Sequence, residues 1–170
     1  MTRNIAPLLT SWEQRHITPA YVFDPLKRAF RIQLDPCTNS DNPLGTEYFI
    51  TETMNGLKAI WQYNAFVNPP YRETKAWVMK GIDEHKARGI TVVFLLANRT
   101  ETEAAQLYAF PQSKAVCFVR RRISFLHPET RKPQGSPTFG SMIVVLKKKQ
   151  LVKKELEILH SQGYVFLNKK

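Results

Sequence analysis

Runs of apolar residues along the chain predict a series of β-strands. The almost unbroken run ITVVFLLA at 90–97 is typical of a strand that is covered on both faces within a parallel sheet. Other short segments are predicted as strands, and most of them end at turn-forming residues. They lie at 31–35, 47–51, 65–68, 115–120 and 141–149.

Other segments carry the features of helices. Pro19 suits the first turn of a helix over 20–30, and Thr18 is available to cap that helix. The segment 73–89 has closely spaced apolar positions and closes on Gly89, which is typical of a helix end. Two further helices are predicted at 100–110 and 153–162.

Strands that alternate with helices predict an α/β fold with a mainly parallel sheet. The 170 residues suit one core, and no repeat or linker divides them, so we expect a single domain over 1–170. Ligands of such sheets bind outside the carboxyl ends of the strands. Asp35, Asn68 and Asn98 each fall at or just past a predicted strand end, so we expect them along one edge. The segment from Asp35 to Asn68 is too short for two full strand–helix units, so a helix should be missing.

Net charge narrows the choice of partners. Lys and Arg number 25 against 14 Asp and Glu, which gives a net charge of +11 and favours nucleic acid as the partner. The two cysteines are far apart, and the histidines lack ligand spacing, so we expect neither a disulfide framework nor a metal site. No apolar stretch approaches the roughly 20 residues that span a bilayer, and no signal peptide begins the chain. We therefore expect a cytoplasmic protein with no membrane partner.

The most specific motif is Asn68-Pro69-Pro70-Tyr71, directly after a predicted apolar strand. It suits an exocyclic amine on a planar ring, whose nitrogen is a poor nucleophile because its lone pair is delocalised. The amide oxygen of Asn68 and the carbonyl oxygen of Pro69 can each accept a hydrogen bond from that amine and free the lone pair. The prolines hold these acceptors in place, and Tyr71 offers a stacking face. We expect these four residues to be catalytic.

This motif resembles the signature of amino-group methyltransferases that use S-adenosylmethionine. Between about residues 12 and 146 the chain resembles the small phage and prophage DNA adenine-N6 methyltransferases. The similar segments, besides the motif, are ITPAYVFDPL, IQLDPCTNS, EYFITETMNGL, VVFLLANRTET and RRISFLHP. The resemblance implies a compact Rossmann-like methyltransferase sheet, S-adenosyl-L-methionine as the cofactor, and adenine N6 in DNA as the target. The target base would have to flip out of the duplex, because its amino group is engaged in pairing.

The resemblance also implies roles for individual residues. Thr18 and Pro19 would contact the carboxylate end of the cofactor. Asp35, Pro36 and Cys37 would line the cofactor pocket, with Asp35 near the cofactor's amino group, and Asn68 would border the sulfonium. Phe125 is a candidate second wall for the flipped base. The chain departs from most methyltransferases in lacking a glycine-rich loop after Asp35, and Glu47 and Glu52 both remain candidates for the cofactor ribose.

Basic segments supply the expected contacts to DNA. The segment 120–140 combines arginines, prolines and a glycine, and we predict that it recognises the target in double-stranded DNA. Four of its basic residues are the expected substrate contacts, namely Arg121, Arg122, Arg131 and Lys132. The run 147–154, which leads into a C-terminal helix within 150–162, and Lys169-Lys170 add attraction that is independent of sequence.

Several alternatives stay open at this point. Cytosine N4 presents the same kind of amine, and glutamine-N5 protein methyltransferases carry the same motif. A non-catalytic DNA-binding relative that has lost the cofactor is a further alternative, because the glycine-rich loop is missing. Oligomeric state and recognition sequence do not follow from the sequence.

Overall fold

Within residues 16–135 and 137–168, which a computed structural model describes, seven strands form one sheet in the order β2-β1-β3-β4-β6-β5-β7. The strands are β1 (Leu34–Thr38), β2 (Tyr48–Thr51), β3 (Ala65–Val67), β4 (Val92–Ala97), β5 (Ala115–Val119), β6 (Ser141–Leu146) and β7 (Gly163–Leu167). The helices are α1 (Ala20–Phe30), α2 (Thr74–Arg88), α3 (Phe110–Gln112) and α4 (Lys153–Gln162), with the 3-10 turn η2 (Tyr71–Glu73) and the π-helix η3 (Ala104–Ala109). Lys169 and Lys170, predicted to attract DNA, lie outside the described residues.

The sheet is mixed, so the prediction of a mainly parallel sheet is wrong. β2, β1, β3 and β4 pair in parallel, whereas the pairs β4–β6, β6–β5 and β5–β7 are antiparallel. β6 follows the long segment 120–140 and inserts between β4 and β5. Every residue of β6 is buried, as are nearly all those of β4. An apolar run of this kind reveals burial on both faces but not strand direction, which is why the prediction failed.

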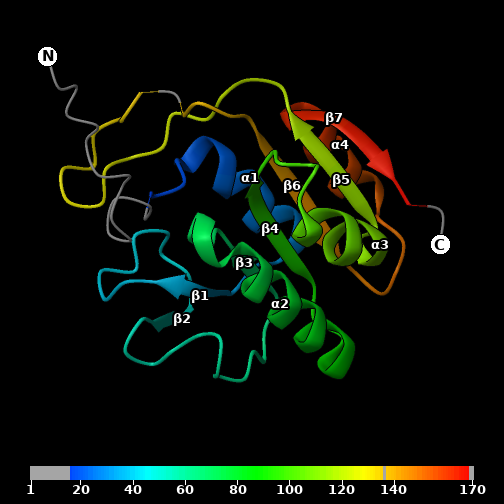
Figure 1. Ribbon diagram of the computed structural model, residues 1–170, viewed down its shortest axis with the longest axis horizontal. Coiled ribbons are helices and arrows are strands. Elements are labelled where there is room, and N and C mark those ends of the chain that lie inside the picture. Colours follow the sequence, from blue (N-terminus) through cyan, green and yellow to red (C-terminus); the bar gives the residue numbers. More distant parts are fainter. Residues whose placement is uncertain (1–15, 136, 169–170) are drawn as a thin grey trace, which may run out of the picture.

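Helices cover both faces of the sheet, and the sheet divides the core into two layers (Figure 1). On one face, α1 and α4 pack against the strands through residues such as Phe23 and Leu159. On the other face, α2 and η3 pack through residues such as Val78 and Ala105. The predicted α/β class is therefore confirmed. Cys117, in β5, lies in the core and its thiol donates to the carbonyl of Leu159 at 3.2 Å.

Most predicted elements are confirmed, with shifts at their ends. α1 spans its predicted residues, and α2 ends at Arg88 with Gly89 as its C-cap, whose φ of 72° is left-handed and suits glycine. The predicted cap of α1 is wrong, because Pro19 occupies the N-cap position and no side chain caps the helix. β7 was not predicted. It follows α4 directly at Gly163, and three of its five residues are exposed at the sheet edge.

The connections around β2 explain why the chain between Asp35 and Asn68 is short. Neither the loop 39–47 before β2 nor the loop 52–64 after it contains a helix, as the spacing predicted. Each loop begins at the carboxyl end of one parallel strand and returns to the amino end of the next, and its first part lines the cavity at the carboxyl ends. They therefore take the place of helical units and wall the site described next.

Candidate active site

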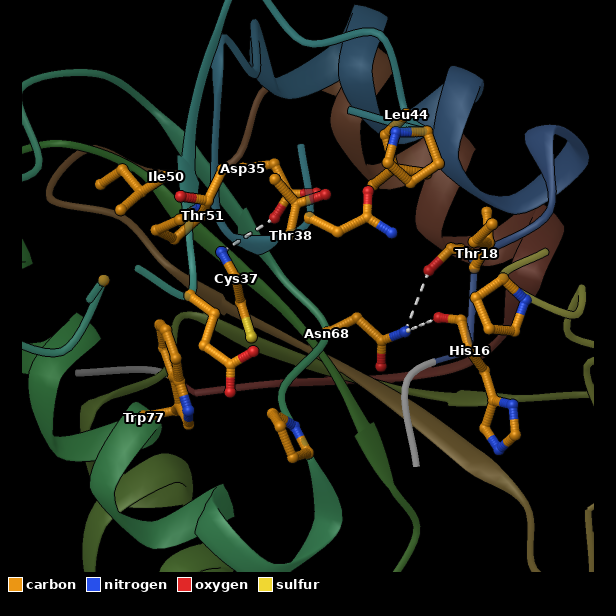
Figure 2. Close-up of a pocket in the computed structure, with 18 of the residues that line it drawn as sticks. His16, Thr18, Asp35, Cys37, Thr38, Leu44, Ile50, Thr51, Asn68 and Trp77 are labelled. Carbon is orange, nitrogen blue, oxygen red and sulfur yellow. Dashed lines mark hydrogen bonds between the residues drawn. The ribbon is translucent and has the colours of Figure 1, made fainter. Parts of the chain in front are cut away.

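A cavity of about 260 Å³ opens at the carboxyl ends of β1 and β3 (Figure 2). Asp35 from β1 and Asn68 after β3 both line it, as predicted from their positions at strand ends. Asn98 follows β4 at the same edge of the sheet, but it is exposed and does not line the cavity. All three residues therefore lie at the predicted edge of the sheet, and two of them, Asp35 and Asn68, line the cavity.

The side chain of Asn68 is held from one side only (Figure 2). Its Nδ2 donates to the backbone carbonyl of His16 at 3.1 Å and to Oγ1 of Thr18 at 3.3 Å. A carbonyl oxygen can only accept, so the carboxamide must present its NH2 group to His16. The amide oxygen is therefore turned away from both partners, and within the described part of the chain no hydrogen bond reaches it.

The rest of the Asn-Pro-Pro-Tyr motif turns the chain into α2. Pro69 is buried, and Pro70 lines the cavity and precedes η2. Tyr71 is half-buried outside the cavity lining, and burial raises its pKa. Its ring meets the ring of Phe139 edge to face at 5.1 Å between centroids. The ring of Tyr71 thus stands next to the cavity, supported from the far end of the segment 120–140.

Asp35 is a buried carboxyl at the cavity wall. Its Oδ1 accepts a hydrogen bond from the backbone amide of Cys37 at 3.1 Å. Burial raises its pKa to about 7, since a low-dielectric site disfavours the charged form. No described basic side chain forms an ion pair with Asp35. A ligand that carries a positive group would supply the partner that this carboxyl lacks.

Predicted cofactor residues cluster around Asp35. Pro36 and Cys37 continue β1 and line the cavity, and Thr18 lines its opposite side, while Pro19 begins α1 behind Thr18. Of the two carboxylates considered for the ribose, only Glu52 lines the cavity. Glu47 is exposed away from it and accepts a hydrogen bond from Gln33 at 3.2 Å.

Sequence reasoning missed an apolar wall made by Trp77, Ile50 and Leu57. Gly56, which lies in the same wall, has no room for a side chain. A Cβ there would come within 2.0 Å of the carbonyl oxygen of Pro36 and 2.8 Å of the Trp77 ring. The glycine therefore lets the loop 52–64 close against β1. The signal available in the sequence was this glycine in the segment MNGL, followed by an apolar residue.

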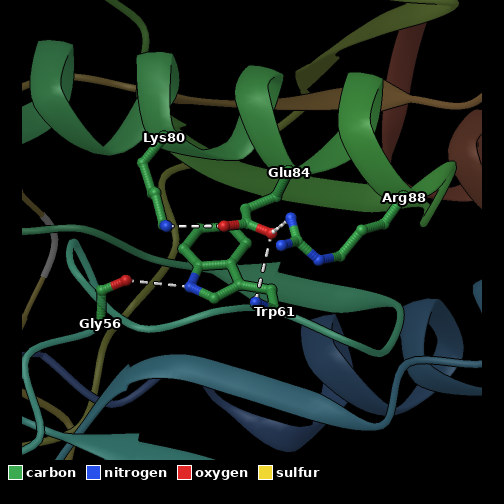
Figure 3. A network of polar contacts seen from close by, with 5 residues as sticks. All are labelled: Gly56, Trp61, Lys80, Glu84 and Arg88. Carbon is green, nitrogen blue, oxygen red and sulfur yellow. Dashed lines mark hydrogen bonds and ion pairs between the residues drawn. The ribbon is translucent and has the colours of Figure 1, made fainter.

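A network of polar contacts fixes the loop 52–64 to α2 (Figure 3). The buried carboxylate of Glu84 forms ion pairs with Lys80, at 2.6 Å, and with Arg88. It also accepts a hydrogen bond from the backbone amide of Trp61 at 3.2 Å. The indole of Trp61 in turn donates to the carbonyl of Gly56 at 2.9 Å. α2 thus anchors the loop that carries the cavity wall.

Replacing Glu84 by alanine should destabilise the fold by about 2–4 kcal/mol, because it leaves the Trp61 amide and two cations without their acceptor. Lys80 and Arg88 can turn toward water, which keeps the loss at the lower end of that range. Urea denaturation measures it. Asp83→Ala, at an exposed position of the same helix, serves as the control and should change stability little. Equal effects of the two substitutions would contradict the role given to the network.

His16 lines the cavity. Burial lowers its pKa, and its ring lies 5.8 Å from that of Phe125 between centroids. Phe125 itself is buried in the core layer beneath α1 and does not line the cavity. The structure therefore does not bring Phe125 to the place expected of a base-stacking wall.

Basic residues of the segment 120–140 are exposed and lie outside the cavity. Arg121 and Arg122 follow β5, and Arg131 and Lys132 lie farther along the same segment. Arg131 forms an exposed ion pair of 3.4 Å with Asp41 in the loop after β1. This contact, together with Pro128 in the cavity lining, keeps part of the segment beside the cavity opening.

Residues 16–135 and 137–168 contain neither a candidate metal-binding group nor a helix that could span a membrane. No group of three or more His, Cys, Asp or Glu side chains is placed there to hold a metal ion. In that same part of the chain, no helix has both the length and the apolar character needed to cross a membrane.

Comparison with known proteins gives two consistent findings. A family model described as DNA N-6-adenine-methyltransferase (Dam) matches residues 8–166. The chain is also similar to a DNA N-6-adenine-methyltransferase of Haemophilus phage HP1 (strain HP1c1). The two are 29% identical over 135 residues, which cover 78% of each protein.

Proposed function

Because this chain belongs to the phage-type DNA N-6-adenine-methyltransferase family, we propose that it transfers a methyl group from S-adenosylmethionine to adenine N6 in DNA. The observation that carries the proposal is the geometry of Asn68, whose amide oxygen is free to accept a hydrogen bond beside a cavity that contains a buried carboxyl. The whole chain would act as one methyltransferase domain. It would work in the cytoplasm of a bacterium or phage-infected cell, where its DNA lies.

The residues of the cavity fit the proposed cofactor. Asp35 offers a buried carboxylate to the positive amino group of its methionine part, and Glu52 offers acceptors to the ribose hydroxyls. Trp77, Ile50 and Leu57 give the adenine an apolar wall. S-adenosylmethionine supplies an electrophilic methyl group on a sulfonium. Gly56 lets the loop 52–64 pack directly against β1 in this wall.

The motif would prepare the target amine. The amide oxygen of Asn68 and the carbonyl oxygen of Pro69 accept its two N–H groups, which frees the nitrogen lone pair for attack. Tyr71 stacks on the flipped adenine, which offsets part of the few kcal/mol that flipping costs. The proton becomes acidic only after the new N–C bond has formed, so no strong base is required at the site.

Family membership favours adenine N6 over cytosine N4 and over glutamine N5 of a protein. Methylation of unmodified DNA by the purified protein, followed by nucleoside mass spectrometry, tests this directly. We expect N6-methyladenine. The appearance of N4-methylcytosine would move the target to the other base, and no methylated nucleoside despite cofactor binding would overturn the proposal.

Positive charge on the segment 120–140 would bind DNA phosphates, which makes the affinity salt-dependent. Replacing Lys132 by glutamine should reduce the magnitude of the negative slope of log K against log salt by about 1, because one phosphate contact is lost. Fluorescence anisotropy with duplex DNA over a range of salt measures that slope. The control is Lys86→Gln, an exposed lysine near the end of α2 on the opposite edge of the sheet. If both variants change the slope equally, the segment has no special part in binding.

A further inference from the structure

Thr18 has a buried hydroxyl that the helix after it does not use. It lies one residue before Pro19, the N-cap of α1, and no side chain caps that helix. Instead its Oγ1 accepts a hydrogen bond from Nδ2 of Asn68, fifty positions along the chain, at 3.3 Å. Thr18 is 3% exposed, so water does not compete for this contact.

Together, Thr18 and His16 decide which way the Asn68 carboxamide faces. With the carbonyl of His16 as second acceptor, both N–H bonds of the Asn68 amide have partners on one side (Figure 2). Rotation of the amide by half a turn would bring its oxygen against the His16 carbonyl, which offers no hydrogen. The contact with Oγ1 of Thr18 restricts smaller rotations of the amide. The amide oxygen therefore stays turned away from the segment 16–18.

The segment 16–18 is itself held by Leu126 of the segment 120–140. The amide of Ile17 donates to the carbonyl of Leu126 at 3.0 Å, and the amide of Leu126 donates to the carbonyl of Ile17 at 3.0 Å. Leu126 also forms an antiparallel β-bridge with Pro133 within the segment 120–140. Ile17 is buried, which adds packing to the two hydrogen bonds. The segment 16–18, which positions Asn68, is therefore hydrogen-bonded to the part of the chain that we expect to contact DNA.

We infer that Thr18 is a positioning residue for methyl transfer, acting through Asn68 and not through the cofactor. This inference rests on the proposed function, since it needs the amide oxygen of Asn68 to accept the target amine. It differs from the role that the family resemblance implies for Thr18, which is contact with the carboxylate end of the cofactor. The two roles predict different kinetics.

Thr18→Val keeps the shape of the side chain and removes the acceptor. At saturating cofactor and DNA its single-turnover rate should fall by about tenfold or more, because misplacement of a group by about 1 Å at a reacting centre can cost 100-fold. Calorimetry should give an unchanged Kd for S-adenosylmethionine, and the binding stoichiometry counts the folded sites to which the rate is normalised. Thr18→Ser, which restores the hydroxyl, should recover most of the rate.

A double-mutant cycle separates a positioning role from a general one. If Thr18 acts through Asn68, adding Thr18→Val to Asn68→Ala should slow the reaction no further. Four results would overturn the inference: a weaker cofactor Kd with an unchanged saturating rate, an unchanged rate in Thr18→Val, no recovery in Thr18→Ser, or additive effects in the cycle. Should Thr18→Val fail to fold, Thr18→Ala takes its place with the same expectations. Failure of the proposed function itself looks different, since the unaltered protein would then bind cofactor and DNA without methylating adenine.

Discussion

Replacing Asn68 by alanine should lower the methylation rate by about 100- to 1000-fold, the usual effect of removing one preorganised group that stabilises a transition state. The substitution removes the acceptor that Thr18 and His16 hold in place. Salt-sensitive DNA binding should remain, because it depends on exposed basic residues elsewhere. Transfer of a tritiated methyl group to DNA under single-turnover conditions measures the rate.

Asn98 provides a matched control for this experiment. It is the same type of residue, it follows the neighbouring strand β4 at the same sheet edge, and it is exposed outside the cavity. Asn98→Ala should therefore methylate DNA at nearly the rate of the unaltered protein. Full activity in Asn68→Ala would remove the central role given to the motif, and equal losses in both variants would point to damage of the sheet edge.

Replacing Asp35 by asparagine should weaken the binding of S-adenosylmethionine by about 30-fold or more, because the loss of one partner of a buried charge pair costs about 2 kcal/mol or more. The same substitution should raise the melting temperature of the protein without cofactor, measured at pH 8. A neutral amide is easier to bury than a carboxylate, and its oxygen can still accept from the amide of Cys37. Calorimetry and thermal denaturation measure the two effects.

Asp24→Asn is the control for the loss of one negative charge, since Asp24 is exposed on α1. It should change neither the cofactor affinity nor the melting temperature appreciably. A fall in the melting temperature of Asp35→Asn, with cofactor affinity retained, would show that Asp35 serves the fold alone.

The pH dependence of cofactor binding follows from the same carboxyl. Burial raises the pKa of Asp35 to about 7, so the folded protein without ligand keeps this proton up to near neutral pH. In the unfolded chain the proton is lost near the ordinary value of 3.8, so Asp35 makes the fold less stable as pH rises from about 4 to 7. Binding of a cationic group needs the charged form, and its affinity should therefore rise with pH up to about 7 and then level off. Asp35→Asn should abolish this rise.

Local features of the sequence were sufficient to place several residues of the candidate site at the sheet edge where the cavity lies. The Asn-Pro-Pro-Tyr motif lies directly after the apolar run that forms β3, and its position at a strand end needs no distant contact. Asp35 likewise ends a short predicted strand beside a turn-forming segment, so its place at the same edge could be predicted. These predictions succeeded because residues adjacent in sequence share one strand and its end.

Contacts between distant segments could not be predicted in this way. The bond from Asn68 to Thr18 joins residues fifty positions apart, and the sequence around Thr18 suggested a helix cap instead. The apolar wall of the cavity combines the loop 52–64 with Trp77 of α2. Phe125 was expected beside the target base but packs in the core, because an aromatic residue in an irregular segment carries no signal of which side it faces.

The sequence by itself determined that this chain is an α/β protein, with a rigid amide-bearing corner after its third strand and a strongly basic surface. Periodicity of apolar residues and the fixed φ of proline act over a few residues, so they can be read directly from the order of amino acids. Only the tertiary structure decided that β6 runs antiparallel between β4 and β5, and that the segment 16–18 holds Asn68. Both depend on which distant surfaces pack together, and that choice is made by the burial of the whole core at once.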